Sequence, residues 1–155
     1  MTSRRRARRL AIDILFQADV TGVDARSVLT GWIGAGHDVP DFTRELVEGV
    51  GGHVEELDGV IGAHSEGWRV GRMAALDRTI LRVAVSELLY STDVPAAVAI
   101  DEAVRAAKEL STEDSGRFVN GVLGKIAQEL DQRELGPEAN RREGSGPGGP
   151  PSTGA

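Results

Sequence analysis

Five arginines stand within six residues near the start of the chain: Arg4, Arg5, Arg6, Arg8 and Arg9. A guanidinium group neutralises phosphate with release of counterions, and it also stacks on unpaired bases. The cluster is therefore typical of a segment that binds RNA. A basic terminus that is merely solvated has the same composition, so the cluster alone leaves both interpretations open.

A second group of chemically useful side chains lies in residues 113–121, EDSGRFVNG. At the mouth of a helix, Asp114, Ser115 and Arg117 could hydrogen-bond the edges of bases, and Phe118 could stack on one base. An ordinary helix N-cap with Phe118 in the hydrophobic core accounts for the same residues. Taken by themselves, the residues favour this simpler interpretation.

No catalytic or metal-binding pattern accompanies these two groups. A Gly-x-Gly-x-x-Gly spacing occurs only at residues 144–149, in the Gly/Pro-rich tail, where no predicted strand precedes it, and the sequence has no Walker A loop, no Gly-x-Ser-x-Gly motif and no cysteine. His37, His53 and His64 are too widely spaced to predict a metal cluster. We therefore expect no catalytic residue, no metal and no cofactor, and hence a binding protein rather than an enzyme.

The net charge of −6 argues against nucleic acid, but the charge is unevenly distributed along the chain. Because the arginine cluster is so basic, the remainder is acidic on average, which indicates an acidic body with a local basic patch. No apolar stretch approaches the roughly 20 residues that a membrane span needs, and no signal peptide is evident. We expect a cytoplasmic protein that does not bind membranes.

Seven helices are expected to position these residues, because apolar residues recur at helical spacing and no stretch alternates like a strand. Ser3 or Thr2 is a candidate cap for the first helix, and Ser111 to Gly116 is expected to form a loop. The arginines occupy the first turns, where the helix dipole disfavours them, and this invites a functional explanation. The expected helices cover about residues 3–19, 24–34, 40–50, 54–61, 73–90, 95–110 and 117–130.

The composition changes from Asp131, where glycine, proline, serine, arginine and glutamate replace the periodic apolar residues. We expect one all-α domain over residues 1–132 and a disordered tail over residues 133–155. The fifth helix is apolar on nearly all sides, which is typical of a central helix.

Four segments, taken in their order and spacing, resemble the NusB family over about residues 4–130. The resemblance implies an all-α fold of two small helical bundles packed at a steep angle. The segments are RRRAR at 4–8, DRTILR and SEL at 77–82 and 86–88, VP and VAIDEA at 94–95 and 98–103, and EDS and FVNGVL at 113–115 and 118–123.

The resemblance also implies a function and a set of site residues. It implies a transcription antitermination factor that binds the single-stranded boxA element of nascent ribosomal RNA. Binding would occur together with NusE, a small-subunit ribosomal protein, within the RNA polymerase antitermination complex. The implied RNA-binding residues are Arg4, Arg5, Arg6, Arg8, Arg9, Phe16, Asp114, Ser115, Arg117 and Phe118, and the implied NusE-binding residues are Asp77, Arg78 and Arg82.

The sequence departs from the family pattern at Asp13 and Ala18, where relatives often carry glutamine and an aromatic residue. A carboxylate at position 13 would repel phosphate near the RNA surface.

Two alternatives stay open. A similar helical domain precedes some ribosomal RNA cytosine methyltransferases, but the large α/β domain and catalytic cysteine that they need are not in this sequence. A homodimer that covered the arginine cluster would compete with RNA.

Overall fold

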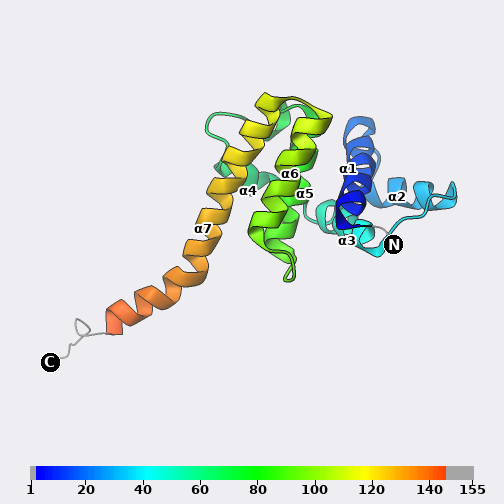
Figure 1. Ribbon diagram of the computed structural model, residues 1–155. Coiled ribbons are helices and arrows are strands. Elements are labelled where there is room, and N and C mark those ends of the chain that lie inside the picture. Colours follow the sequence, from blue (N-terminus) through cyan, green and yellow to red (C-terminus); the bar gives the residue numbers. More distant parts are fainter. Residues whose placement is uncertain (1–2, 146–155) are drawn as a thin grey trace.

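The computed structural model describes residues 3–145, with side chains described for residues 3–133. Within this part the chain forms seven α-helices, one short 3-10 turn and no strand, which confirms the expected all-α class (Figure 1). None of the described helices is long and apolar enough to cross a membrane. The elements are α1 (Arg4–Thr21), α2 (Ala25–Gly34), α3 (Asp41–Gly51), α4 (Val54–Ala63), η1 (Val70–Arg72), α5 (Ala75–Tyr90), α6 (Ala96–Leu110) and α7 (Glu113–Ser145).

The helices form two groups that share α5. α1, α2 and α3 pack against one another, whereas α4, α6 and α7 pack around α5. α1 and α3 also pack on α5, so this helix has neighbours from both groups (Figure 1). Its buried residues are Thr79, Ile80, Leu81, Val83, Ala84, Val85, Ser86 and Glu87, which explains why the sequence pattern is apolar on nearly all sides.

α7 begins earlier than expected, because Thr112 caps it. The backbone N–H of Ser115 donates to the Thr112 hydroxyl at 3.0 Å, and the N–H of Gly116 donates to the Thr112 carbonyl at 3.1 Å. Glu113 and Asp114 occupy the first turn, where acidic side chains suit the helix dipole. The expected loop from Ser111 to Gly116 is therefore wrong for residues 113–116.

α7 continues past the expected helix end near residue 130, since its backbone stays helical through Ser145. Residues 133–143, RELGPEANRRE, contain three arginines and three glutamates, which favour helices, together with Gly136 and Pro137, which disfavour a helix interior. The rest of the expected tail, residues 146–155, lies outside the described residues.

Candidate nucleic-acid interface

The arginine cluster occupies the first turns of α1, which are anchored on α3. The hydroxyl of Ser3 accepts a hydrogen bond from the backbone N–H of Arg6 at 3.2 Å, which confirms one of the two expected caps. The Thr43 hydroxyl donates to the Ala7 carbonyl at 2.8 Å in buried surroundings. The guanidinium carbon of Arg4 lies 4.5 Å from the centre of the Phe42 ring, a cation–π contact. The cluster therefore projects from a fixed support.

Arg8 points into the protein. It is only 7% exposed, and its guanidinium donates three hydrogen bonds of 2.7–3.0 Å to the carboxylate of Glu87 on α5. Glu87 is itself buried, so each charge is compensated chiefly by the other. Arg8, which the resemblance implies as an RNA-binding residue, is therefore buried and paired inside the chain in this conformation. Arg8 ties the first helical group to α5.

Arg4, Arg5 and Arg9 are solvent-accessible and pair with acidic residues of the second group. Arg4 contacts Asp93 at 2.7 Å. Arg5 donates two hydrogen bonds to Glu102, both 3.0 Å, and Arg9 contacts Glu109 at 2.5 Å. The earlier residue of α1, Arg5, pairs with the earlier residue of α6, Glu102. The later residue, Arg9, pairs with the later Glu109, so the two helices run in the same direction (Figure 1).

Two of these ion pairs lower the pKa of their carboxyl groups. The hydrogen bond from Arg4 lowers the pKa of Asp93, and that from Arg5 lowers the pKa of Glu102. Both carboxylates therefore remain charged to lower pH than usual. Asp13 behaves differently, because partial burial raises its pKa against the opposing effect of Arg9.

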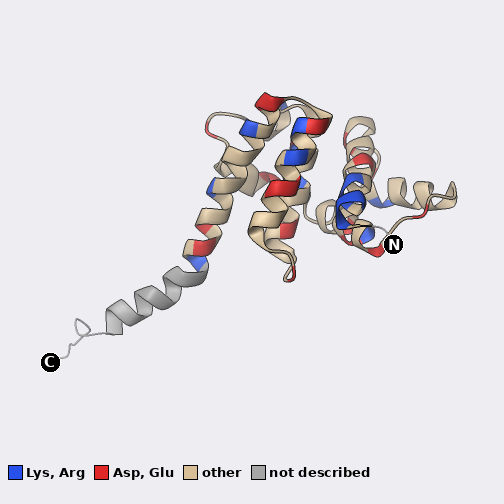
Figure 2. Ribbon diagram, in the orientation of Figure 1, with Lys and Arg blue, Asp and Glu red and all other residues tan. Residues whose placement is uncertain are grey.

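Two exposed arginines beside these pairs make no ion pair with any described residue. Arg6 lies on α1, and Arg105 lies on α6 between Glu102 and Glu109. Arg105 lines the same groove between α1 and α6 as Arg5 and Arg9. Blue segments in the first half of α1 and on α6 mark this charge in Figure 2. The sequence analysis missed Arg105, because a lone arginine on an amphipathic helix carries no signal until its neighbours in space are known.

We call the exposed residues Arg4, Arg5, Arg6, Arg9 and Arg105 the arginine face. Phe16 is 36% exposed and lies two turns beyond Arg9 on the same side of α1. Arg9 pairs with Glu109 near the end of α6, so Phe16 lies beyond that end and does not line the groove between α1 and α6.

The residues expected at the start of α7 surround a hollow of about 210 Å³. The Ser115 hydroxyl donates to Asp77 Oδ2 at 3.1 Å, and the ring of Phe118 meets that of Trp68 edge-on, with 6.1 Å between ring centres. Arg117 does not line the hollow, but it pairs with Asp114, which does. The hollow shares no lining residue with the groove beside the arginine face. The residues that line the hollow are mainly Trp68, Met73, Asp77, Asp114, Ser115 and Phe118.

Phe118 belongs both to the edge of the core and to the hollow. Trp68, on the segment between α4 and η1, is a site residue that the sequence analysis missed. It is 58% exposed, and no motif in the sequence marks a tryptophan in a connecting segment.

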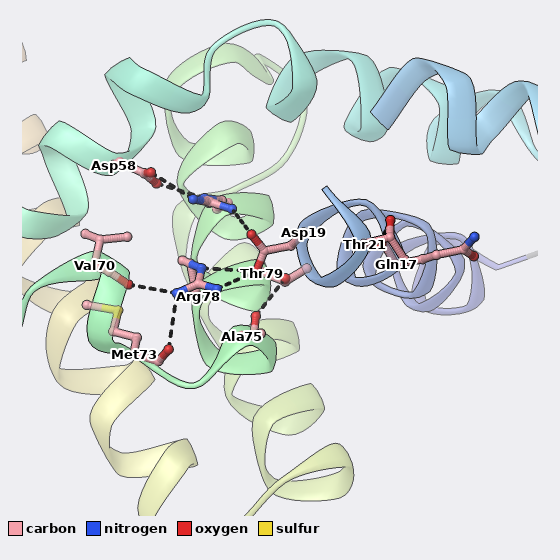
Figure 3. Close-up of polar contacts among 10 residues, drawn as sticks. Gln17, Asp19, Thr21, Asp58, Val70, Met73, Ala75, Arg78 and Thr79 are labelled. Atoms are coloured by element: carbon pink, nitrogen blue, oxygen red, sulfur yellow. Dashed lines mark hydrogen bonds and ion pairs between the residues drawn. The ribbon is translucent and has the colours of Figure 1, made fainter. Parts of the chain in front are cut away.

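Arg78 and Arg82, expected at the partner interface beside Asp77, make hydrogen bonds inside the chain, and Figure 3 shows those of Arg78. Arg78 donates to Asp19 Oδ2 at 2.6 and 3.1 Å and to the carbonyls of Val70 and Met73 at 3.0 and 3.2 Å. Arg82 makes two 2.8 Å hydrogen bonds to Asp58 and a longer one, 3.4 Å, to Asp19. These contacts join α1, α4 and η1 to α5.

Among the described residues, no group of histidine and acidic side chains could hold a metal ion. The geometry of the site is instead that of a binding surface. It consists of guanidinium groups along α1 and α6, one exposed phenylalanine, and a separate aromatic hollow that contains a carboxylate.

Comparison with known proteins agrees with this arrangement. A family model described as the NusB family matches residues 5–128. The transcription antitermination protein NusB of Saccharopolyspora erythraea is 50% identical over 131 residues, which cover 82% of this chain and 88% of that protein. The protein of the same name from a Nocardioides species is 45% identical over 129 residues, covering 83% of this chain and 96% of its own.

Solved structures give the same result. T. maritima NusB superposes with a TM-score of 0.75 at 36% identity, covering 83% of this chain and 92% of its own. A crystal structure of the antitermination factors NusB and NusE in complex with double-stranded RNA superposes with a TM-score of 0.72 at 26% identity, covering 81% of this chain and 96% of the matched chain. From the family model, the identities and the shared fold, this chain belongs to the NusB family.

Proposed function

We propose that this chain is a non-catalytic transcription antitermination factor that binds the boxA element of nascent ribosomal RNA together with NusE. It would act within the RNA polymerase antitermination complex in the cytoplasm. The observation that carries the proposal is the arginine face on a NusB-type fold. The relatives named antitermination proteins support it, as does the related structure of NusB and NusE with RNA.

In this proposal the arginine face supplies affinity for phosphate. Arg6 and Arg105 are available without loss of an internal ion pair, whereas Arg4, Arg5 and Arg9 exchange a carboxylate for a phosphate. Phe16 stacks on an unpaired base, as exposed aromatic side chains do in single-stranded RNA recognition. Arg8 supports this surface from beneath.

NusE binds the edge marked by Asp77 in this proposal. Arg78 and Arg82 hold α5 in place there rather than contacting the partner, because their donors are used inside the chain. Asp114, Ser115 and Phe118 line the hollow beside Asp77, so the RNA surface that the resemblance implies for them lies next to the proposed NusE surface.

A homodimer is the second candidate. Phe16, Val20 and Val23 are all exposed apolar side chains at the C-terminal half of α1 and just beyond it. A dimer that covered them would hide part of the arginine face. RNA affinity would then fall as protein concentration rises, whereas an unchanged affinity across the monomer–dimer range would remove this candidate.

Alanine substitution of Arg6 and of Arg105 tests the proposal. Each variant is expected to bind single-stranded boxA RNA about three- to tenfold more weakly in fluorescence anisotropy, because one phosphate contact is lost. Arg133→Ala is the matched control, since Arg133 is exposed on α7 and pairs with Glu129 away from the arginine face. Equal losses in all three variants would show that only net charge matters and would contradict the proposed site.

A further inference from the structure

Three carboxylates, on α6 and just before it, lie opposite the arginines of α1. A carboxylate oxygen and a phosphate oxygen make the same kind of charged hydrogen bond to a guanidinium group. Each carboxylate therefore occupies a place that an RNA phosphate could take. The pairs, in order along the chain, are Asp93 with Arg4, Glu102 with Arg5 and Glu109 with Arg9.

The three pairs differ in how firmly the carboxylate is held. The side chain of Glu102 is only 15% exposed, and it accepts two hydrogen bonds from Arg5. The side chains of Asp93 and Glu109 are 66% and 50% exposed, and each accepts one hydrogen bond from its arginine. Exposed pairs of this kind stabilise a protein little, because water solvates both partners. Asp93 and Glu109 are therefore the carboxylates that an incoming phosphate can displace most easily.

The position of Glu109 is not explained by the helix that carries it. Glu109 lies in the last turn of α6, next to Leu110, where the helix dipole is negative and disfavours a carboxylate. Lys108 beside it has the charge that this helix end prefers. Among the described side chains, Glu109 accepts a hydrogen bond only from Arg9, at 2.5 Å. The contact that accounts for this carboxylate is therefore the one with the arginine face.

We propose that Asp93 and Glu109 are intramolecular competitors of RNA, each of which holds a guanidinium group that an RNA phosphate would bind. The inference rests on the proposed function, because it concerns the same arginine face. Phosphate contacts carry no sequence information, so the two carboxylates weaken the binding of every single-stranded RNA by a similar factor. An RNA that also makes base contacts and contacts with NusE still binds, whereas an RNA held by phosphate contacts alone is released.

Removal of each negative charge tests the competition in the full chain. Asp93→Asn and Glu109→Gln are each expected to bind boxA RNA, without NusE, about two- to fivefold more tightly in fluorescence anisotropy, because the phosphate no longer displaces a carboxylate. An unrelated single-stranded RNA of the same length is expected to gain by the same factor. Glu55→Gln is the matched control, since Glu55 is exposed on α4 and does not line the groove between α1 and α6. The control is expected to change the affinity by less than about 1.5-fold.

A double-mutant cycle assigns the effect to the ion pair itself. In a chain that already carries Arg9→Ala, Glu109→Gln is expected to strengthen RNA binding no more than Glu55→Gln does. The reason is that the guanidinium group for which the carboxylate and the phosphate compete has been removed. An equal gain with and without Arg9 would show that Glu109 acts only through the general field of the protein, and would overturn the proposal.

The remaining outcomes separate this inference from the proposed function. A gain confined to boxA RNA would show that the carboxylate faces a base rather than a phosphate, and would also overturn the competition. If the unmodified chain binds boxA RNA but neither variant binds it more tightly than Glu55→Gln does, the inference fails and the proposed function stands. If neither the unmodified chain nor any variant binds boxA RNA, with or without NusE, the proposed function and this inference both fail.

Discussion

Arg6 and Arg8 are two residues apart in the arginine cluster, yet they lie in opposite environments. Arg6 is exposed and makes no ion pair with any described residue, whereas the buried guanidinium of Arg8 is neutralised by buried Glu87. On a helix, two residues separated by one other point in widely different directions. The number of arginines in the cluster therefore does not give the number that can bind phosphate.

Alanine substitution is expected to separate these two roles. Arg8→Ala leaves Glu87 buried without a counter-charge, so the free energy of unfolding should fall by about 3–5 kcal/mol. Arg6→Ala should change it by less than about 0.5 kcal/mol. Urea unfolding of both variants measures the difference. Equal stability of the two variants would contradict the buried ion pair.

The lowered pKa of Glu102 predicts how the stability of the folded chain changes with pH. Its pKa is lowered in the folded state by the hydrogen bond from Arg5, so the unfolded chain binds a proton more readily at this position. The contribution of the pair to stability is thus complete above the unfolded pKa and is lost as the pH falls through the lower folded pKa. Glu102→Gln should unfold with a weaker dependence on pH below about 4.5 than the unmodified chain. An identical slope in thermal melts from pH 5 to pH 3 would rule out this linkage.

At the scale of single residues, the sequence allowed the prediction of the arginines, Phe16 and the start of α7 as candidates. It did not distinguish buried Arg8 from its exposed neighbours, because α1 carries arginine on several sides. Arg105 and Trp68 were missed since each lies alone in the sequence. Their role depends on α1 lying beside α6 in one case and on a connecting turn in the other.

The helices themselves were predictable from apolar periodicity, and their ends were predictable where a cap is simple. Ser3 and Asp24 accept hydrogen bonds from the N–H groups of Arg6 and Ser27, as capping side chains do. The predicted start of α7 was wrong because Glu113, Asp114, Ser115 and Gly116 resemble a loop, whereas Thr112 caps a helix that includes them. The end of α7 was placed too early, since the loss of apolar periodicity removes the packing signal without stopping the helix.

α3 and α5 pack closely at Gly49. Alanine substitutions of Gly49 and of Gly59 can measure how much this close packing contributes to stability. A Cβ atom at Gly49 would lie 2.9 Å from the Ser86 hydroxyl, whereas one at Gly59 on α4 would meet nothing within 4 Å. Both Gly49→Ala and Gly59→Ala gain helix propensity, so their difference isolates the packing clash. Gly49→Ala is expected to be less stable than Gly59→Ala by about 1–3 kcal/mol. Chemical denaturation of the two variants measures this difference. Equal free energies of unfolding would mean that α3 and α5 can move apart at Gly49 without loss of stability.

The whole molecule is held together through α5, which is buried by both helical groups. Arg8, Arg78 and Arg82 each make an ion pair that joins α1 to α5. Because the two groups share one core, we expect a single cooperative transition, with circular dichroism and tryptophan fluorescence changing together. Two separated transitions would show that the groups fold independently.

Charge is also organised at the scale of the whole molecule. The chain has a net charge of −6, yet five arginines are concentrated in the first turns of α1, and Arg105 of α6 lies beside them (Figure 2). The sequence predicted this asymmetry, but not that acidic residues of α6 and Asp93 neutralise part of the cluster. RNA has to compete with these internal carboxylates, so affinity should depend on ionic strength and on a partner that adds contacts.

The most direct test of the central claim is the binding of a short single-stranded boxA RNA across a salt series, with and without NusE. If the arginine face contacts about three to five phosphates, log affinity should fall against log salt with a slope of roughly −2 to −3.5. The account predicts this slope and a tighter complex when NusE is present. Absence of binding under both conditions, or binding that salt does not weaken, would contradict it.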